Sequence, residues 1–178
     1  MDKKLLYNHQ KLNVTLNRLA FELVENYGDF SEAAIVGLQP RGVLPARIIK
    51  DKIENIIQKN VLYGELDITF YRDDYRTSSK QLTASPIHIP FSIEGLKIIL
   101  IDDVLYTGRS IRSAMDALVD FGRPDKVELC VLIDRIHHRE NPISADYIGK
   151  AIDTRGREQT VQVDWEENNY KVWLKTHE

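Results

Sequence analysis

The sequence predicts an α/β domain: a parallel sheet flanked by helices, with a small extension of edge strands toward the C-terminus. Short apolar runs alternate along the chain with segments of helical periodicity. These apolar runs are nearly continuous, which is typical of strands that are buried on both faces. A chain of 178 residues fits one domain with its own core. We expect that core over about 30–136, and a hood with C-terminal strands over about 137–178.

The first half of the chain predicts two helices and two strands. Leucine and alanine recur at helical spacing over 8–26, and the apolar run AAIVGL over 33–38 predicts a short buried strand. Leucine and isoleucine return to helical spacing over 44–59. GELDITFYR, over 64–72, alternates like a strand with one buried face. The polar stretch 73–85 then predicts a mobile loop, and a loop of this length is often functional.

The second half supplies the remaining elements. LKIILIDDV, over 96–104, predicts the next buried strand. A helix follows over 110–121, and Gly122 and Pro124 after it are a normal stop signal. KVELCVLID, over 126–134, predicts a third buried strand. Short strand candidates separated by polar turns follow at 145–149, 160–165 and 170–174.

Composition is that of an ordinary globular protein, with 43% hydrophobic and 29% charged residues and a formal net charge of −3. That charge argues against a general nucleic-acid binder, whose domain is usually strongly basic. The single cysteine, Cys130, lies in an apolar run, so we expect it to be buried and unreactive. His137 and His138 lack a matching ligand cluster and predict a solvated loop rather than a metal site. The polar N-terminus has no apolar signal core, which predicts a cytoplasmic protein.

The stretch IILIDDVLYTGRSI carries two adjacent carboxylates directly after an apolar strand. In an open parallel sheet, ligands bind outside the carboxyl ends of the strands. Asp102 and Asp103 repel each other at such an edge, so the site favours a partner that accepts both. A ribose diol offers hydroxyl donors, and a bound divalent cation offers positive charge.

The turn after the two acids is suited to an anion. Gly108 permits a tight turn and close backbone approach. Successive backbone N–H groups can form an anion-binding concavity there, and the following helix points its positive end at the same place. Thr107 and Ser110 add hydroxyl donors. One segment therefore offers a diol site beside a phosphate site, which fits a ribose 5-phosphate.

This pattern resembles the signature with which type I phosphoribosyltransferases bind 5-phosphoribosyl-1-pyrophosphate (PRPP). The resemblance implies the type I phosphoribosyltransferase fold, and Mg²⁺ that arrives mainly with PRPP rather than in a metal site of the protein. It assigns the ribose-phosphate site to Asp102, Asp103, Tyr106, Thr107, Gly108, Arg109 and Ser110. The acidic pair would also act in catalysis, because its negative field suits the positive charge that builds on the ribose ring as pyrophosphate leaves.

Two further segments are predicted to hold the departing pyrophosphate. GLQPRG follows the first buried strand and resembles the pyrophosphate loop of the family through Gln39, Pro40, Arg41 and Gly42. The Arg41 guanidinium is suited to phosphate oxygens. Arg72 ends its predicted strand and is a candidate catalytic residue. Arg76 and Lys80 lie on the polar loop, which fits either a solvated surface loop or a lid that excludes water.

Longer stretches are similar to the family of bifunctional pyrimidine operon regulators and uracil phosphoribosyltransferases known as PyrR. They are GLQPRGVLPARI, GELDITFYRDDY, IDDVLYTGRSIRSAMDALVDFGRP and ADYIGK, and the likeness runs from about 12 to about 150. The resemblance implies pyrimidine salvage: transfer of a phosphoribosyl group from PRPP to uracil, giving UMP and pyrophosphate. It also implies a homodimer or a higher homo-oligomer. DRIHHRENP is one residue longer than the family pattern, Ser144 replaces a common arginine, and Asp153 a common proline.

The base site is assigned by resemblance as well. The 6-oxopurine enzymes carry an aspartate where this chain has Tyr106, which favours a pyrimidine. Tyr147 and Ile148 match a segment in which the purine enzymes stack an aromatic residue on the base, although Tyr147 also fits a tyrosine in a core strand. Asp134 and Arg135 end the third buried strand and would border the same pocket.

Other functions stay open beside uracil transfer. The resemblance implies binding of an mRNA leader when UMP is present, which would attenuate transcription of pyrimidine genes. Such binding needs Arg and Lys clustered on one face. The first predicted helix has Lys11 and Arg18 but also Glu22 and Glu25, and ADYIGK adds Lys150. A transferase for another nucleobase and a degenerate nucleotide sensor are the remaining alternatives, and the intact acids and Thr-Gly turn argue against the sensor.

Overall fold

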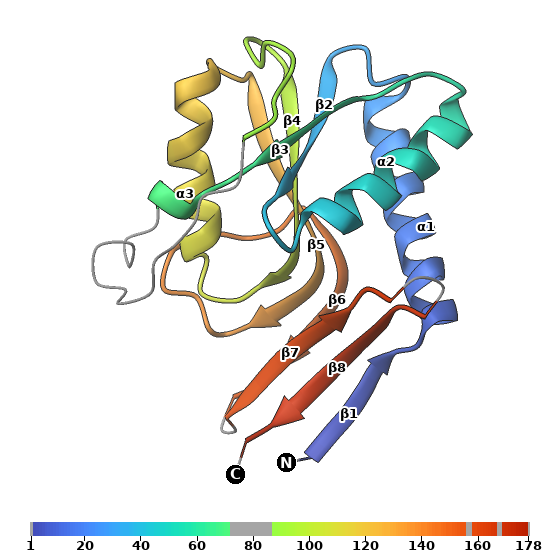
Figure 1. The fold of residues 1–178 in the computed structure, drawn as a ribbon, viewed down its shortest axis with the longest axis vertical. Coiled ribbons are helices and arrows are strands. Elements are labelled where there is room, and N and C mark those ends of the chain that lie inside the picture. Colours follow the sequence, from blue (N-terminus) through green and yellow to red (C-terminus); the bar gives the residue numbers. More distant parts are fainter. Residues whose placement is uncertain (1, 72–86, 156–157, 167–168, 178) are drawn as a thin grey trace.

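The computed structural model describes residues 2–71, 87–155, 158–166 and 169–177 (Figure 1). A parallel sheet runs in the order β3 (Leu62–Leu66), β2 (Ala33–Leu38), β4 (Lys97–Leu105), β5 (Lys126–Ile136) and β6 (Tyr147–Asp153). A smaller antiparallel sheet runs in the order β1 (Asp2–Tyr7), β8 (Lys171–Thr176) and β7 (Gln159–Asp164). The α-helices of the described residues are α1 (His9–Tyr27), α2 (Val43–Ile57) and α3 (Arg109–Leu118).

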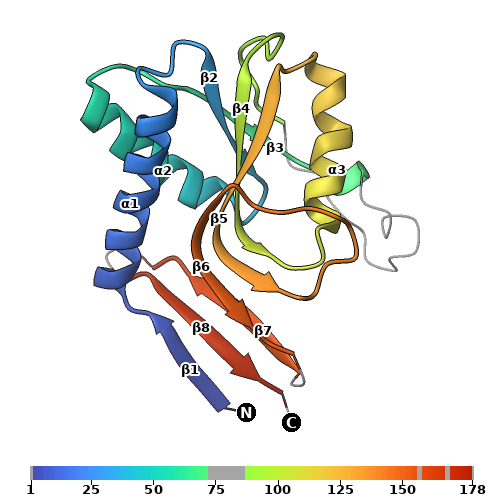
Figure 2. The same ribbon diagram turned by 180° about the vertical axis from the view of Figure 1, so that it is seen from behind.

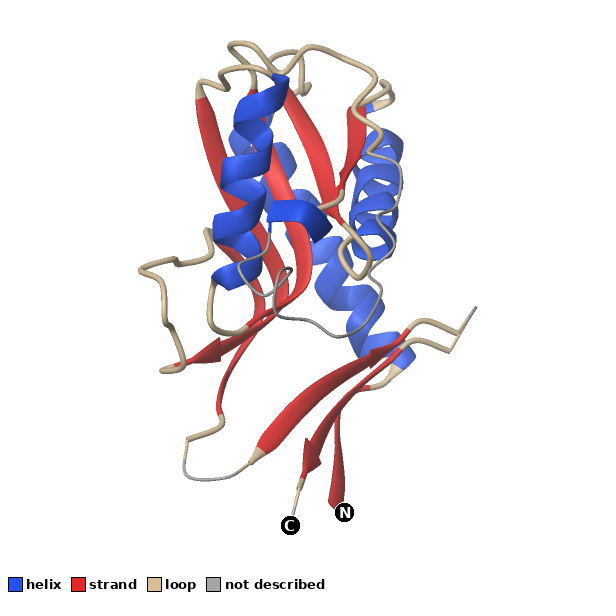
Figure 3. Cartoon of the chain, turned by 60° about the vertical axis from the view of Figure 1, so that its left-hand side comes forward, coloured by secondary structure: helices blue, strands red, loops and turns tan. Residues whose placement is uncertain are grey.

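Helices cover both faces of the parallel sheet. α1 and α2 lie on one face and α3 on the other, so the sheet is the middle layer of three (Figures 1 and 3). The inner strands β2, β4 and β5 are buried over most of their length, as their near-continuous apolar sequences predict. The α/β class with a parallel sheet flanked by helices is therefore confirmed. None of the described helices is both long and apolar enough to cross a bilayer.

The first helix follows the predicted apolar stripe. It begins after Asn8, whose side chain accepts a hydrogen bond of 2.9 Å from the Lys11 amide. It ends at Gly28, which has a φ of 59°. The side chains facing the sheet are fully buried, and each leucine among them contributes about 2 kcal/mol of hydrophobic free energy. They are Leu12, Leu16, Leu19, Ala20 and Leu23.

The small sheet lies beyond the carboxyl ends of the strands of the parallel sheet (Figures 1 and 2). It contains β1, a strand that the sequence analysis did not predict, because an edge strand with lysines lacks a strong apolar pattern. β6, by contrast, lies after 136 but pairs with β5 in the parallel sheet. The strands therefore divide differently from the expected boundary at 136: both ends of the chain build the small sheet, and part of the expected hood belongs to the core.

The predicted strand over 64–72 is wrong at both ends. β3 begins two residues earlier, and the chain leaves the sheet after Leu66 to form a 3-10 turn over Thr69–Tyr71. The cause is Asp67, whose carboxylate accepts hydrogen bonds from the Thr69 amide at 2.7 Å and from its hydroxyl at 2.6 Å. Such a local side-chain bond offers the backbone an alternative to the sheet.

The predicted strand over 96–104 extends to Leu105, beyond both acids. Asp102 pairs in register with Val131, and Leu105 with Asp134, so the long neighbour β5 keeps β4 in the sheet. Cys130, one residue before Val131, is buried as predicted. Burial raises the pKa of its thiol to about 12, so the reactive thiolate is disfavoured.

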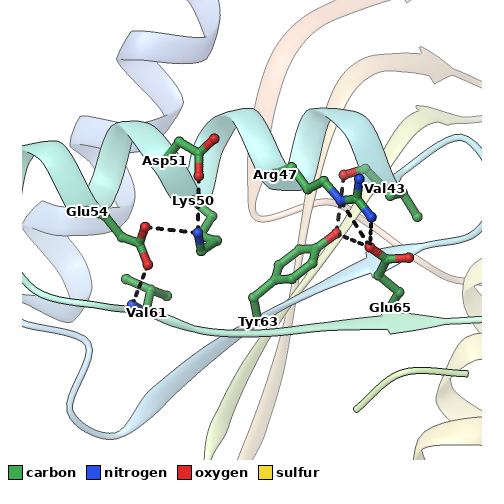
Figure 4. A network of polar contacts seen from close by, with 8 residues as sticks. All are labelled: Val43, Arg47, Lys50, Asp51, Glu54, Val61, Tyr63 and Glu65. Carbon is green, nitrogen blue, oxygen red and sulfur yellow. Dashed lines mark hydrogen bonds and ion pairs between the residues drawn. The ribbon is translucent and has the colours of Figure 1, made fainter. Parts of the chain in front are cut away.

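A polar network ties α2 to the edge strand β3 (Figure 4). The Arg47 guanidinium contacts the Glu65 carboxylate at 2.5 Å, and the Tyr63 hydroxyl donates to the same carboxylate at 3.0 Å. Tyr63 also donates to the Val43 carbonyl in the first turn of α2, at 3.4 Å. These bonds hold the start of α2, and with it the preceding loop, at a defined place beside the sheet.

Candidate active site

The acidic pair lies near the carboxyl end of the central strand β4. Asp102 is 8% exposed and Asp103 is 5% exposed. The Asp103 amide donates a hydrogen bond of 2.9 Å to the Asp102 carboxylate, which orients the Asp102 side chain. Burial raises the pKa of both carboxyl groups, and the neighbouring negative charge of Asp103 raises that of Asp102 further. The empty site therefore disfavours the doubly ionised pair, and a partner that supplies positive charge or hydroxyl donors relieves it.

The Gly37–Gly42 loop connects β2 to α2 beside these acids. The positive charge of Arg41 opposes the burial effect at both carboxyl groups by lowering their pKa values, so its guanidinium lies close enough to act on the pair. Gly42 makes the close approach possible, because a Cβ there would lie 2.1 Å from the Ile101 carbonyl oxygen. The loop is held at its other end by the Gln39 amide, which donates to the Leu66 carbonyl at 2.9 Å. The structure thus brings Arg41 to the predicted acidic pair.

The segment 106–110, here called the phosphate loop, follows β4 and leads into α3. Gly108 has a φ of 87°, a conformation that favours glycine, and the helix begins at the next residue. The backbone amides of the first turn carry the positive end of the helix dipole. Arg109 forms an ion pair of 2.6 Å with Glu140. Ser110 lies in the first turn of α3, partly exposed.

Asp134 and Arg135 end β5 beside the phosphate loop, and both already have partners within the protein. The Arg135 guanidinium lies 3.9 Å from the centre of the Tyr106 ring and donates at 2.7 Å to the Gln159 carbonyl in β7. It therefore links the parallel sheet, the phosphate loop and the small sheet. Asp134 forms an ion pair with Arg139. These residues form the wall of the site rather than groups free to turn toward a base.

Tyr147 faces α1, whereas Ile148 lies level with Asp102, two strands away: it pairs in register with Val131, and Val131 pairs with Asp102. Tyr147 starts β6 and pairs in register with Cys130. Its hydroxyl donates at 2.9 Å to the buried carboxylate of Glu128 and accepts at 3.0 Å from the Asn26 amide, on the face covered by α1. The Ile148 carbonyl accepts a bond of 2.9 Å from Arg18. For Tyr147 this geometry agrees with the alternative of a core tyrosine, and the assignment of Ile148 to the base site stays a prediction.

We expect Tyr147→Phe to lower stability without changing recognition of the base. The hydroxyl donates to a buried carboxylate, so its loss should lower the free energy of unfolding by about 1–2 kcal/mol. Chemical denaturation measures this loss, and steady-state kinetics should give a KM for the base within twofold of wild type. A large rise in that KM with unchanged stability would instead restore Tyr147 to the base site.

Some predicted residues lie outside the described part of the chain. These are Arg72, Arg76 and Lys80, together with the loop over 73–85, and their roles stay predictions. His138, which we expected in a solvated loop, is half-buried: a ring nitrogen lies 2.7 Å from the Thr154 hydroxyl, and the ring lies 5.2 Å from that of Tyr106.

Sequence reasoning missed two residues at this edge, Arg139 and Thr154. Thr154 is 1% exposed and bonds both Arg135 and His138. Arg139 lies in the DRIHHRENP segment, where its charge was visible, but its partners are mainly carbonyl groups. Backbone acceptors leave no mark in a sequence, so only the folded chain shows this role.

Comparison with known proteins agrees with this geometry. A model of the phosphoribosyl transferase domain matches residues 3–168. The fold is similar to a hypoxanthine-guanine phosphoribosyltransferase of Bacillus anthracis, with a TM-score of 0.66 at 18% identity over 85% of this chain and 84% of that one. It is also similar to a hypoxanthine phosphoribosyltransferase of Staphylococcus aureus, with a TM-score of 0.63 at 19% identity over 85% and 79%. The chain is a phosphoribosyltransferase with the type I fold.

Curated relatives identify the family of phosphoribosyltransferases to which the chain belongs. A protein of Elusimicrobium minutum named Bifunctional protein PyrR is 51% identical over 85% of this chain and 84% of its own length. Another of that name, from Bacillus subtilis, is 42% identical over 99% of this chain and 98% of its own. The chain belongs to the PyrR family, which confirms the resemblance seen in its motifs.

Proposed function

We propose that this protein transfers the 5-phosphoribosyl group of PRPP to uracil, giving UMP and pyrophosphate. The proposal rests on one observation: the buried acidic pair, the Gly37–Gly42 loop with Arg41, and the phosphate loop that leads into α3 lie together at one edge of the sheet. The relatives named Bifunctional protein PyrR support the choice of a pyrimidine.

Each group of residues binds or stabilises a different part of the substrate according to its charge. The bond between the anomeric carbon and the pyrophosphate oxygen breaks while the bond to the uracil nitrogen forms, and the proton of that nitrogen is released to water. Negative charge then grows on pyrophosphate, and Arg41, whose positive charge acts on the acidic pair, would stabilise it. Asp102 and Asp103 accept hydrogen bonds from the ribose diol, and their ionised forms favour the positive charge on the ring. The amides of residues 107–110 receive the 5-phosphate.

Magnesium fits the donor set of this site. Two buried, adjacent carboxyl groups offer the hard oxygen ligands, direct or through water, that Mg²⁺ prefers, and the positive charge of the ion would favour their ionised forms. When bound with PRPP, the ion would neutralise charge on the pyrophosphate. Asp102 and Asp103 are the residues that would meet it or its water ligands.

The base site is proposed with Asp134 and Arg135 as supporting wall residues. Arg135 lies against the exposed ring of Tyr106, which is 42% accessible to solvent at the mouth of the phosphate loop. A planar base placed above the ribose would meet this stacked pair. Assembly as a homodimer or higher homo-oligomer, and location in the cytoplasm, are part of the same proposal through the family.

A base screen tests the proposal. The protein is incubated with PRPP, Mg²⁺ and uracil, hypoxanthine, guanine or orotate, and each nucleotide product is separated by chromatography. We expect UMP to form fastest. Faster formation of a purine nucleotide or of orotidine monophosphate would replace uracil as the acceptor, and no product with any base would contradict transfer altogether.

Binding of an mRNA leader stays a prediction, and the described part of α1 gives it little support. Arg18 forms an ion pair with Glu22 at 2.8 Å and donates hydrogen bonds to the carbonyls of Ile148 and Gly149 in β6. Glu25 and Asp146 line the same shallow hollow beside α1, so that face is acidic. We therefore expect weak RNA binding there with a small salt dependence, measured as the change of log Kd with log salt in the presence of UMP. A steep slope, as several phosphate contacts produce, would contradict this expectation.

A further inference from the structure

We propose that Arg139 is a positioning residue for phosphoribosyl transfer: it turns the peptide groups of the phosphate loop so that their amides face the substrate phosphate. This inference rests on the proposed function of the same site. Arg139 follows β5 and is partly buried. It does not belong to the acidic pair or to the Gly37–Gly42 loop.

The guanidinium is surrounded by acceptors from three segments. It donates at 2.6 Å to the Tyr106 carbonyl in the phosphate loop and at 3.0 Å to the Arg135 carbonyl in β5. Its Nε donates at 2.9 Å to the Ile143 carbonyl of its own loop. An ion pair with Asp134 completes the set. Only a guanidinium offers enough donors, in a planar fork, for all of these acceptors at once.

The residues after Arg139 hold the next carbonyl of the phosphate loop. The amides of Glu140 and Asn141 both donate to the Thr107 carbonyl, at 2.9 Å and 3.1 Å. Side-chain atoms of Asn141 and Ile143 lie 3.4 Å from where a Cβ on Gly108 would be. The segment 139–143 therefore packs directly on the outside of the phosphate loop.

Because of peptide geometry, these contacts also fix the direction in which the backbone amides of the phosphate loop point. In a trans peptide, the C=O and the following N–H point in opposite directions. When the Tyr106 carbonyl points toward Arg139, the Thr107 amide points away from it. The same holds for the Thr107 carbonyl and the Gly108 amide. Both amides are thus directed to the side opposite the 139–143 segment, where the positive end of α3 favours an anion.

The experiment compares Arg139→Ala and Arg139→Lys with wild type and with Arg155→Ala. Arg155 is the matched control, since it is an exposed arginine paired with Asp153 at 2.7 Å. For each protein, steady-state kinetics gives kcat and the KM values for PRPP and uracil, calorimetry gives the Kd for ribose 5-phosphate, and thermal unfolding gives Tm.

We expect Arg139→Ala to raise the KM for PRPP and the Kd for ribose 5-phosphate by about 10-fold or more, the effect of losing one to two charge-assisted hydrogen bonds. The KM for uracil should stay within twofold. Arg139→Lys should recover part of the affinity, because lysine keeps the charge but not the fork. Arg155→Ala should leave all of these constants unchanged.

The outcomes separate this inference from the proposed function. If wild type makes UMP and Arg139→Ala keeps normal constants for PRPP and ribose 5-phosphate, the positioning role is wrong. If wild type makes no UMP but Arg139→Ala still weakens ribose 5-phosphate, the positioning role stands while uracil transfer fails. If both Arg139 variants unfold, or if both KM values rise equally, Arg139 is a structural residue and the inference is overturned.

Discussion

Asp102→Asn is expected to remove most of the activity and at the same time to stabilise the fold. The wild-type protein buries two adjacent carboxyl groups at 8% and 5% exposure, and burial raises the pKa of each. Ionising both in the empty site is therefore unfavourable. The neutral amide is nearly isosteric, accepts the same hydrogen bond from the Asp103 amide and removes the repulsion.

The expected magnitudes are large enough to measure. The loss of one charged partner of the ribose and its developing charge should lower kcat/KM by about 100-fold or more. Removal of a like-charged buried neighbour should raise the free energy of unfolding by about 1–2 kcal/mol, which corresponds to a rise in Tm of about 2–8 °C. Asp103→Asn should act in the same direction.

Asp116→Asn is the matched control, because Asp116 is an exposed carboxylate on α3. It should change stability by less than about 0.5 kcal/mol and leave activity unchanged. A fall in Tm for both site variants would contradict the account, since it would mean that the carboxylates stabilise the empty fold rather than the bound state.

Stability should also depend on pH through the same pair. The pKa values of Asp102 and Asp103 are raised in the folded state, so the folded protein binds more protons than the unfolded chain above the ordinary carboxyl range. Their contribution to stability is therefore greatest below the unfolded pKa and is lost as pH rises through the folded pKa. Urea unfolding at a series of pH values above the ordinary carboxyl pKa should show that the free energy of unfolding of wild type falls as pH rises. The fall should be smaller in Asp102→Asn. An equal fall with pH in both proteins would show that other titratable groups cause it.

Gly42→Ala is expected to lower stability more than a glycine-to-alanine substitution at Gly37, the other glycine of the Gly37–Gly42 loop. The new Cβ would lie 2.1 Å from the Ile101 carbonyl oxygen and 2.8 Å from that of Leu38. Both are backbone atoms of buried strands, so neither can rotate away as a side chain would. The loop must move instead, and Arg41 moves with it.

We expect this variant to lose about 2–4 kcal/mol of stability and, because a shift of about 1 Å in a positioned group can cost it, about 100-fold in kcat/KM. Gly42 has a φ of −78°, so alanine is not strained there and the clash is the only cause. Gly28→Ala is the control: nothing lies within 4 Å of its Cβ, but its φ of 59° should cost about 1 kcal/mol. Equal losses for the two variants would show that steric approach at Gly42 is unimportant.

Periodicity predicted the elements that are buried on both sides. β2 has the predicted bounds, α1 is displaced by one residue, and Cys130 lies in the core where its apolar neighbours indicated. Prediction was poorest where a local polar bond competed with the sheet, as at Asp67, or where a strand depends on a partner far away in the sequence, as in β1 with β8. Neither effect can be predicted from the hydrophobic pattern of neighbouring residues.

The candidate site was predictable to the extent that it is contiguous in sequence. Asp102, Asp103 and the turn at Gly108 all lie within the short segment 102–108, so their proximity needs no tertiary information. Tyr147 shows the limit of assignment by resemblance: its residue type fits a stacking group, but the register of β6 against β5 places its ring on the face of α1.

By itself the sequence determined the α/β class, the acidic pair with its phosphate turn and the PyrR family, because each is written in consecutive residues or in their periodicity. The tertiary structure alone decided that Arg41 acts on the acids, that Tyr147 belongs to the core, and that Arg139 holds the phosphate loop. The physical reason is that these roles depend on burial, strand register and backbone carbonyl groups, which arise only when distant segments pack together.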